Sequence, residues 1–235
     1  MDLDQENNAK MDFSEDLVTV ADSSGVASEA YRTLRTNLFY TQIDTPPKVI
    51  VVTSPGAQEG KSTTCANLGV VLAQAGKETL VLDCDLRKPT LHNIFGMRNL
   101  QGLVDLLAGW YRPQEIWGEP IPKLKLISAG PPPPNPSELL SSQRLVEFLN
   151  QARQEFDYVL IDTPPARMAS DSTILAAQAD GVLLTLDSKK TRKTALRQTV
   201  HRLERVGANV LGTVMIKADF SKGEYLYHGD TYTSK

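Results

Sequence analysis

The sequence predicts an α/β protein built on a mostly parallel, doubly wound sheet. Short apolar runs alternate with longer segments of helical period between residues 49 and 216. The runs are rich in β-branched residues and show little polar alternation, which is typical of parallel strands covered on both faces. Acidic residues directly follow two of the runs, at the end of a strand where α/β proteins bind ligands. We expect strands at 49–53, 79–84, 124–128, 156–162, 181–186 and 209–216, with helices at 62–75, 170–179 and 191–206 and a helical segment at 137–152 that is broken at Ser141-Ser142.

The composition limits the classes of function. A chain of 235 residues with 41% hydrophobic residues can bury one substantial core, and a net charge of −3 argues against a general nucleic-acid binder, so no nucleic-acid partner is expected. The only cysteines, Cys65 and Cys84, fit a reducing compartment. No apolar run approaches the roughly 20 residues that span a bilayer. We therefore expect a cytoplasmic protein that reaches a membrane only through a partner.

The N-terminal region divides into two segments. Residues 1–27 contain seven acidic residues against the single Lys10, so they predict a flexible, loosely ordered arm before a folded domain at 28–219. The segment 28–38 has helical period and places Glu29, Arg32 and Arg35 on one stripe. This stripe is either a solvated face, whose ion pair contributes only a few tenths of a kcal/mol, or a contact between subunits.

A phosphate-binding loop is predicted between the first strand and the first long helix. The apolar run stops at Pro55-Gly56, and Gly60-Lys61-Ser62-Thr63 then opens a helix, as in a variant Walker A motif whose first glycine is replaced by Pro55. Lys61 would reach the β- and γ-phosphates of ATP, and Ser62 would hold Mg²⁺. The alternative is a glycine-rich turn with a solvated lysine. The residues expected to contact the nucleotide are Gly56, Ala57, Gln58, Glu59, Gly60, Lys61, Ser62 and Thr63.

Three aspartates complete the predicted site. Asp83 and Asp85 end the second strand, and Asp162 ends an apolar run with the form of a Walker B motif. Carboxylate oxygens are preferred ligands of Mg²⁺, so together with Lys61 these residues predict a P-loop NTPase with Walker A, A′ and B motifs. For the first pair, a polar turn at the strand exit is the alternative.

Two further features lie near the C-terminus. The segment 220–235 shows no helix or strand period and is too polar to bury Tyr225, Tyr227 and Tyr232, which predicts a flexible tail with exposed phosphoacceptors; a docked segment is the alternative. The last predicted helix and the turn before it are strongly basic. They form either a solvated face or a docking patch for an acidic partner. The residues are Lys189, Lys190, Arg192, Lys193, Arg197, Arg202 and Arg205.

Between residues 28 and 216 the sequence resembles the bacterial tyrosine kinases (BY-kinases) of capsule and exopolysaccharide synthesis, in the form whose cytoplasmic kinase is separate from its transmembrane activator. Besides the phosphate loop and Ile161-Asp162-Thr163-Pro164-Pro165, three segments carry the resemblance. They are Glu29-x-x-Arg32-x-x-Arg35-Thr36-Asn37, Leu82-Asp83-Cys84-Asp85-Leu86-Arg87-Lys88-Pro89, and Gly130-Pro131 with Asn135-Pro136-Ser137-Glu138-Leu139-Leu140.

The resemblance implies an ATP-dependent protein-tyrosine kinase that phosphorylates its own C-terminal tyrosines in trans, besides other protein tyrosines. By this resemblance Asp83 is the catalytic base, and Ser62, Asp85 and Asp162 hold hydrated Mg²⁺. The resemblance also implies that the helix bearing Glu29, Arg32 and Arg35 would assemble subunits into a ring. It further implies a membrane-bound adaptor that would activate the kinase and recruit it to the inner face of the cell membrane.

This chain departs from the family pattern in two places. Its tail tyrosines are few and spaced, and Ile216 stands where the family usually has an asparagine at the nucleotide base. The lack of that asparagine also removes a guanine-reading motif, which favours ATP.

The main alternative is an ATP-dependent switch that dimerises, resembling partitioning and septum-positioning ATPases. Those proteins carry a second lysine five residues before the invariant one, where this chain has Gly56. A dimerising switch also has no use for the tyrosine tail. A non-catalytic scaffold is disfavoured because Lys61, Ser62 and the three aspartates are all present.

Overall fold

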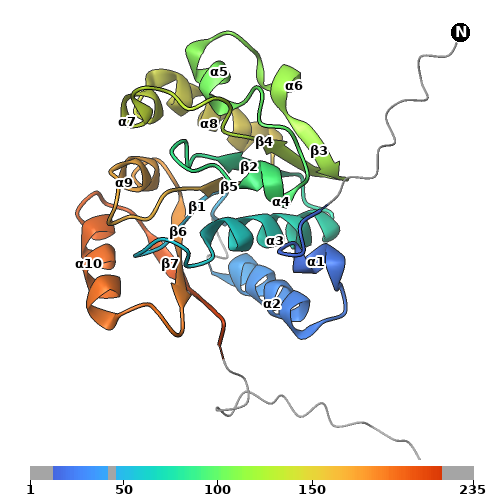
Figure 1. The fold of residues 1–235 in the computed structure, drawn as a ribbon, viewed down its shortest axis with the longest axis vertical. Coiled ribbons are helices and arrows are strands. Elements are labelled where there is room, and N and C mark those ends of the chain that lie inside the picture. Colours follow the sequence, from blue (N-terminus) through green and yellow to red (C-terminus); the bar gives the residue numbers. More distant parts are fainter. Residues whose placement is uncertain (1–12, 42–45, 219–235) are drawn as a thin grey trace, which may run out of the picture.

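The computed structural model describes residues 13–41 and 46–218, and it contains the predicted sheet. Its seven strands lie in the order β3-β4-β2-β5-β1-β6-β7, and all neighbouring pairs except β3 with β4 are parallel. Figure 1 shows the sheet crossing the molecule between two layers of helices. The strands are β1 (Val49–Thr53), β2 (Thr79–Asp83), β3 (Gly118–Ile121), β4 (Leu124–Ile127), β5 (Tyr158–Asp162), β6 (Gly181–Asp187) and β7 (Val210–Ile216).

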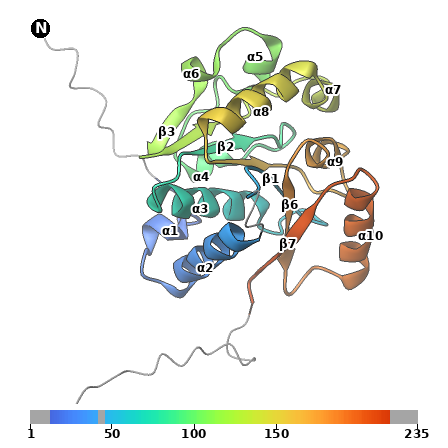
Figure 2. The same ribbon diagram turned by 180° about the vertical axis from the view of Figure 1, so that it is seen from behind.

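Alternate residues of the central strands enter two separate cores. Val49 and Val51 of β1 face one core, and Ile50 and Val52 face the other, because successive side chains of a strand point to opposite faces. Figure 2 shows β7 between α10 on one side and α2 on the other. One layer contains α1 (Val18–Ala21), α2 (Val26–Tyr40), α3 (Lys61–Gln74) and α4 (Leu91–Ile94). The other contains α5 (Leu103–Ala108), α6 (Pro113–Ile116), α7 (Pro136–Leu140), α8 (Gln143–Glu155), α9 (Asp171–Ala176) and α10 (Lys193–Glu204).

Residues 13–27 are folded, which corrects the expectation of a loosely ordered arm in this part of the chain. Leu17 is fully buried beside α3, and α1 and the start of α2 follow it. The buried side chain of Asn67 holds the segment, since its amide donates to the Asp16 carbonyl and its oxygen accepts from the Thr19 amide and hydroxyl. A few specific contacts therefore order a segment whose composition is acidic.

The strand β3 was not predicted. It pairs antiparallel with β4 at the sheet edge, where Pro120 is tolerated, and Lys123 in the connecting turn has a positive φ of 69°. The site itself depends on the centre of the sheet. There β2, β5 and β1 lie side by side in parallel, with Asp83 opposite Asp162 and Val52 opposite Asp162 in the register. The carboxyl ends of these strands therefore bring together residues that are far apart in sequence.

Candidate active site

The loop between β1 and α3 has the backbone that a phosphate cradle requires. Gly60 precedes α3 with a left-handed φ of 75°, a conformation that favours glycine. A Cβ atom at this position would lie 2.6 Å from Cδ1 of Ile216, so the end of β7 packs directly against the loop. Lys61, 8% exposed, and Ser62 then open the first turn of α3. The amide groups of such a helix start favour bound phosphate.

The loop is held from the side by the segment that joins β6 to α10. The buried Glu59 carboxylate accepts hydrogen bonds from the Gly56 amide and the Thr191 hydroxyl, each at 2.6 Å, and Lys190 Nζ donates to the Ala57 carbonyl at 2.6 Å. Gly56 and Glu59, which the sequence placed among the nucleotide contacts, do not line the cavity in front of the loop. These two residues instead stabilise the shape of the loop, because the Gly56 amide donates its hydrogen bond to the Glu59 carboxylate.

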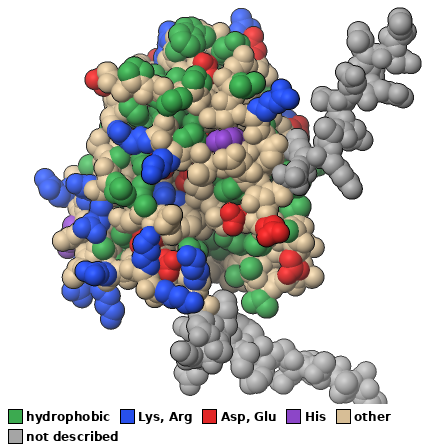
Figure 3. All heavy atoms as spheres, in the orientation of Figure 1, with side chains coloured by type: hydrophobic (Ala, Val, Ile, Leu, Met, Phe, Trp, Pro, Cys, Tyr) green, Lys and Arg blue, Asp and Glu red, His purple; other side chains and the backbone are tan. Residues whose placement is uncertain are grey.

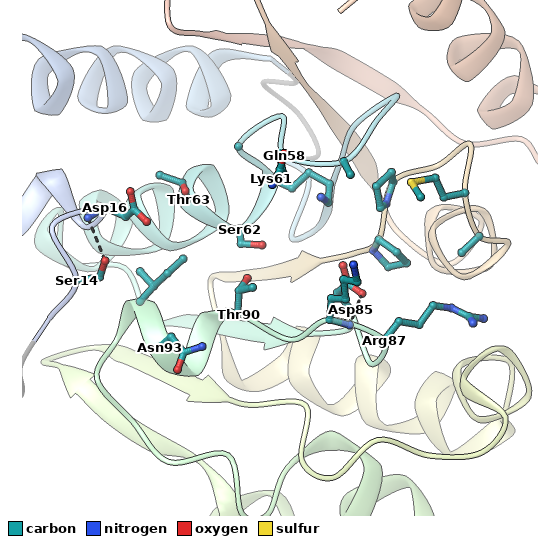
Figure 4. Close-up of a pocket in the computed structure, with 18 residues that line it drawn as sticks. Ser14, Asp16, Gln58, Lys61, Ser62, Thr63, Asp85, Arg87, Thr90 and Asn93 are labelled. Carbon is teal, nitrogen blue, oxygen red and sulfur yellow. Dashed lines mark hydrogen bonds between the residues drawn. The ribbon is translucent and has the colours of Figure 1, made fainter. Parts of the chain in front are cut away.

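A cavity of about 690 Å³ opens in front of the loop and has the size of a small-molecule site. Figure 4 shows Gln58, Lys61 and Ser62 on one side of it, with Asp85 and Thr90 facing them from the segment after β2. The wall after β5 is apolar. The remaining predicted nucleotide contacts, Ala57, Gly60 and Thr63, also line this cavity, as do Arg87, Pro164, Pro165 and Met168.

Asp83 is buried behind the wall of this cavity. Its Oδ2 accepts the amides of Thr90 and Leu91, each at 3.1 Å, and its Oδ1 accepts the amide of Asp85 at 3.2 Å. Burial, followed by the negative charge of Asp162, raises the pKa of Asp83 well above its ordinary value. Asp83 is fully buried and does not line the cavity, whereas Asp85 is 8% exposed and does. Of the two predicted carboxylates, only Asp85 is open to a ligand in this conformation.

Asp162 is a buried carboxylate whose oxygens are free to bind a cation. The residue is fully buried, and neither carboxylate oxygen completes a hydrogen bond. Burial raises its pKa to about 7, although the charge of the nearby Lys61 ammonium lowers it. Among the described residues no three His, Cys, Asp or Glu side chains lie close enough to enclose an ion. The carboxylates of Asp85 and Asp162 and the hydroxyl of Ser62 nevertheless offer oxygen donors, which Mg²⁺ prefers, and this ion usually keeps phosphate and water ligands besides.

Arg87 is a site residue to which the sequence analysis assigned no role. Its Nε donates to Asp171 Oδ2 at 2.9 Å, and its Nη2 lies 3.3 Å from the Ser137 hydroxyl. Asp171 is fully buried at the start of α9, while the Arg87 side chain is 47% exposed and lines the cavity. The pair raises the pKa of Arg87, the Asp171 hydrogen bond being the main cause. The buried Asp171 carboxylate thus holds the Arg87 guanidinium in place at the cavity. The only sequence pattern that could have indicated a role for Arg87 is the motif at 82–89, which contains it.

The N-terminal segment also reaches the site. Ser14 and Asp16 line one end of the cavity, and the Asp16 amide donates to the Ser14 hydroxyl at 3.2 Å (Figure 4). No local sequence pattern indicates these residues, because their placement depends on Asn67, about fifty positions further along the chain.

The predicted subunit helix is α2, and its polar stripe has partners within the chain. Arg32 lies 2.9 Å from Glu29 and also donates to the Ser23 carbonyl, and Arg35 donates to the Val71 carbonyl of α3 at 3.2 Å. The Glu29 side chain is 68% exposed. The contact between subunits stays a prediction. Tyr225, Tyr227 and Tyr232 lie outside the described residues, and so does the tail at 220–235. No helix within 13–41 and 46–218 is long and apolar enough to cross a bilayer.

The sheet order, the phosphate loop and the strand-end carboxylates define a P-loop nucleotide-binding protein of the α/β class. The family model described as "CobQ/CobB/MinD/ParA nucleotide binding domain" matches residues 50–225. Tyrosine-protein kinase YwqD of Bacillus subtilis is 39% identical over 215 residues, which cover 91% of each chain. The putative tyrosine-protein kinase CapB of Staphylococcus aureus is 34% identical, covering 86% of this chain and 90% of that one. The chain therefore belongs to the bacterial tyrosine-protein kinases, a branch of this nucleotide-binding family.

Solved structures agree with this assignment. The chimerical protein CapA2B2 matches with a TM-score of 0.81 at 35% identity, over 86% of this chain and 89% of that chain. The kinase domain of the Escherichia coli tyrosine kinase ETK also has a TM-score of 0.81, at 29% identity over 88% of this chain and 84% of that one. The septum site-determining protein MinD of Pyrococcus horikoshii matches with a TM-score of 0.61 at 21% identity over 72% of this chain and 69% of that one, a likeness of fold alone. The comparisons thus favour the kinase over the dimerising switch.

Proposed function

We propose that this chain is an ATP-dependent protein-tyrosine kinase that transfers the γ-phosphoryl group to tyrosines of the C-terminal segment of another copy. The observation that carries the proposal is the pair Asp83 and Asp162, which lie opposite each other in the register of β2 and β5, next to Lys61. A buried carboxylate pair beside a phosphate loop provides both a base and a cation ligand. The family to which the chain belongs favours tyrosine as the acceptor.

The protein contributes mainly position and charge to the transfer. The phenol oxygen forms a bond to the γ-phosphorus while the bond from that phosphorus to the bridging oxygen breaks, so that ADP leaves. Lys61, which is nearly buried, offsets the phosphate charge in surroundings where water screens it little. Mg²⁺, when bound by Ser62, Asp85 and Asp162, supplies further neutralisation of that charge. The apolar wall at Pro164 and Pro165 limits access of water.

We propose that Asp83 is the general base that accepts the proton of the tyrosine hydroxyl. The pKa of a phenol is near 10, so the raised pKa of Asp83 makes the difference between the two pKa values smaller and favours transfer of the proton. Asp83 is held by the amides of Thr90 and Leu91, and Thr90 lines the cavity. A tyrosine hydroxyl therefore reaches Asp83 only if the segment at Thr90 moves when the substrates bind.

A pair of variants separates the two carboxylate roles. Asp83→Asn should lower phosphotyrosine formation by about 10²- to 10⁴-fold, the usual contribution of a general base, while binding of Mg-ADP changes little. Asp85→Asn should weaken binding of Mg-ADP as well, because Asp85 is assigned to the metal. Equal loss of nucleotide affinity in both variants would contradict the assignment of separate roles.

The acceptors and partners complete the proposal. The acceptors are Tyr225, Tyr227 and Tyr232, and other protein tyrosines serve as external substrates. Subunits assemble into a ring through Glu29, Arg32 and Arg35. The kinase works in capsule or exopolysaccharide synthesis, where a membrane-bound adaptor recruits it to the inner face of the cell membrane. The 34% identity to CapB and the similarity to the chimerical CapA2B2 support this setting.

The deciding experiment mixes two variants of the full chain. One has an intact site and phenylalanine in place of the three tail tyrosines; the other carries Lys61→Met and an intact tail. Incubation with Mg-ATP should give phosphotyrosine at the three tail positions of the Lys61→Met chain, because the transfer occurs in trans. Absence of phosphotyrosine, even with an activator fragment present, would refute the kinase proposal. Association that depends on ATP, without phosphotyrosine, would instead favour the dimerising switch.

A further inference from the structure

A second cavity, of about 460 Å³, lies between α10 and the loop that follows β5. Four of the residues that line it are exposed residues of α10 and the turn after it, spaced as one face of a helix, and the fifth comes from the loop. The lining residues are Arg167, Gln198, His201, Arg202 and Arg205. Three of the five carry a guanidinium, and none is a carboxylate.

The surroundings of this basic cavity strengthen its positive charge. Residues 188–206 contain seven Lys and Arg against the single Glu204, although the whole chain has a net charge of −3. Figure 3 shows blue side chains gathered at the lower left, where Figure 1 has α10. Glu204 lies 3.2 Å from His201. Arg167 and Arg205 have no ion-pair partner within the described part of the chain. Their guanidinium groups are therefore available to an anionic ligand.

One loop separates the basic cavity from the active site. Pro165 and Met168 line the active-site cavity, while Arg167 between them lines the basic cavity. The loop is anchored at its centre, because Arg202 donates to the carbonyl of the buried Ala166 at 2.6 Å. The two cavities therefore lie close together, on either side of a single anchored loop.

We propose that the basic cavity binds the phosphotyrosine side chain of a C-terminal segment of this chain, an inference that rests on the proposed function. A phosphomonoester carries a charge of about −1.5 to −2 and three acceptor oxygens. It can therefore accept hydrogen bonds from several arginines at once, and it suits this cavity better than a carboxylate, which has only two oxygens. The volume of the cavity exceeds what a bare phosphate needs and leaves room for the ring. The proximity of the active site favours the product of the transfer over an unrelated anion.

The test uses a synthetic, fluorescent peptide of residues 219–235 with phosphotyrosine at Tyr225, added to the full chain without ATP. We expect it to bind at least about tenfold more tightly than the unphosphorylated peptide, because a charge-assisted hydrogen bond contributes more than a neutral one. Arg167→Ala and Arg205→Ala should each weaken binding about tenfold. Arg197→Ala, on α10 but outside the cavity, is the matched control and should stay within about twofold. Thermal unfolding checks that each variant is folded.

Three results would overturn the inference. The first is binding that ignores phosphorylation, and the second is phosphopeptide binding unchanged by both cavity variants. The third is binding of anionic phospholipid vesicles with the expected dependence on Arg167 and Arg205 while the phosphopeptide does not bind. Because the peptide is synthetic and ATP is absent, none of these results depends on kinase activity. A chain that binds the phosphopeptide but forms no phosphotyrosine would refute the proposed function and leave the anion site standing.

Discussion

Replacement of Asp162 by asparagine should stabilise the protein in the absence of ligands above neutral pH. The pKa of Asp162 rises from the ordinary value of 3.8 to about 7 in the folded chain. At about 1.4 kcal/mol for each pH unit, the ionised carboxylate therefore lowers the free energy of unfolding by about 4 kcal/mol. Because the pKa is higher in the folded state than in the unfolded state, this destabilisation is absent below about pH 4 and is complete above about pH 7. Asparagine removes the charge but leaves an amide without partners, at a cost of about 1–3 kcal/mol. The net gain expected at pH 8 is therefore about 1–3 kcal/mol.

Urea unfolding at about pH 5 and about pH 8, without Mg²⁺ or nucleotide, measures this difference. The gain of Asp162→Asn over the parent should appear at pH 8 and shrink toward pH 5, where the parent carboxyl is protonated. Mg²⁺ should stabilise the parent more than the variant, because the variant lacks the carboxylate that binds it. Glu147→Gln, at an exposed position of α8, is the control for loss of one charge. A variant less stable than the parent at pH 8, or a gain independent of pH, would refute the reasoning.

Three further variants test the contacts around the site. Gly60→Ala should lower the free energy of unfolding by about 1–3 kcal/mol, because the position has a positive φ and the new Cβ would collide with Ile216. Adding Ile216→Val to this variant should restore part of the lost stability in urea unfolding, because valine lacks Cδ1. Asn67→Ala should destabilise the chain by about 2–4 kcal/mol and increase hydrogen exchange at residues 14–21, and unchanged exchange would contradict its role as their anchor. Asp171→Asn should lower phosphotyrosine formation about tenfold without a change in Mg-ADP affinity, because it loosens Arg87; reduced affinity would place Arg87 at the nucleotide instead.

The sequence predicted the centre of the fold well because its signals there are local. The run Val49–Thr53, the glycine before Lys61 and the aspartates at the ends of β2 and β5 are each visible within a few residues. The conformation of Glu59 was not predictable in this way, because it depends on Thr191, 132 positions away. The edge strand β3 was missed because Pro120, with the exposed Glu119 before it and the half-buried Ile121 after it, gives no strand pattern.

The helix α3 connects these features. Lys61 and Ser62 open it, Asn67 on its buried face holds the N-terminal segment, and the Val71 carbonyl accepts from Arg35 of α2. Residues 61 and 71 are about 15 Å apart along a helix, at 1.5 Å per residue, so the phosphate site and the α2 contact share one rigid element. Substitution of Arg35 therefore disturbs α3 even in a monomer. Glu29, with its 68% exposed side chain, is the residue of the stripe whose replacement can reveal a subunit contact without that effect.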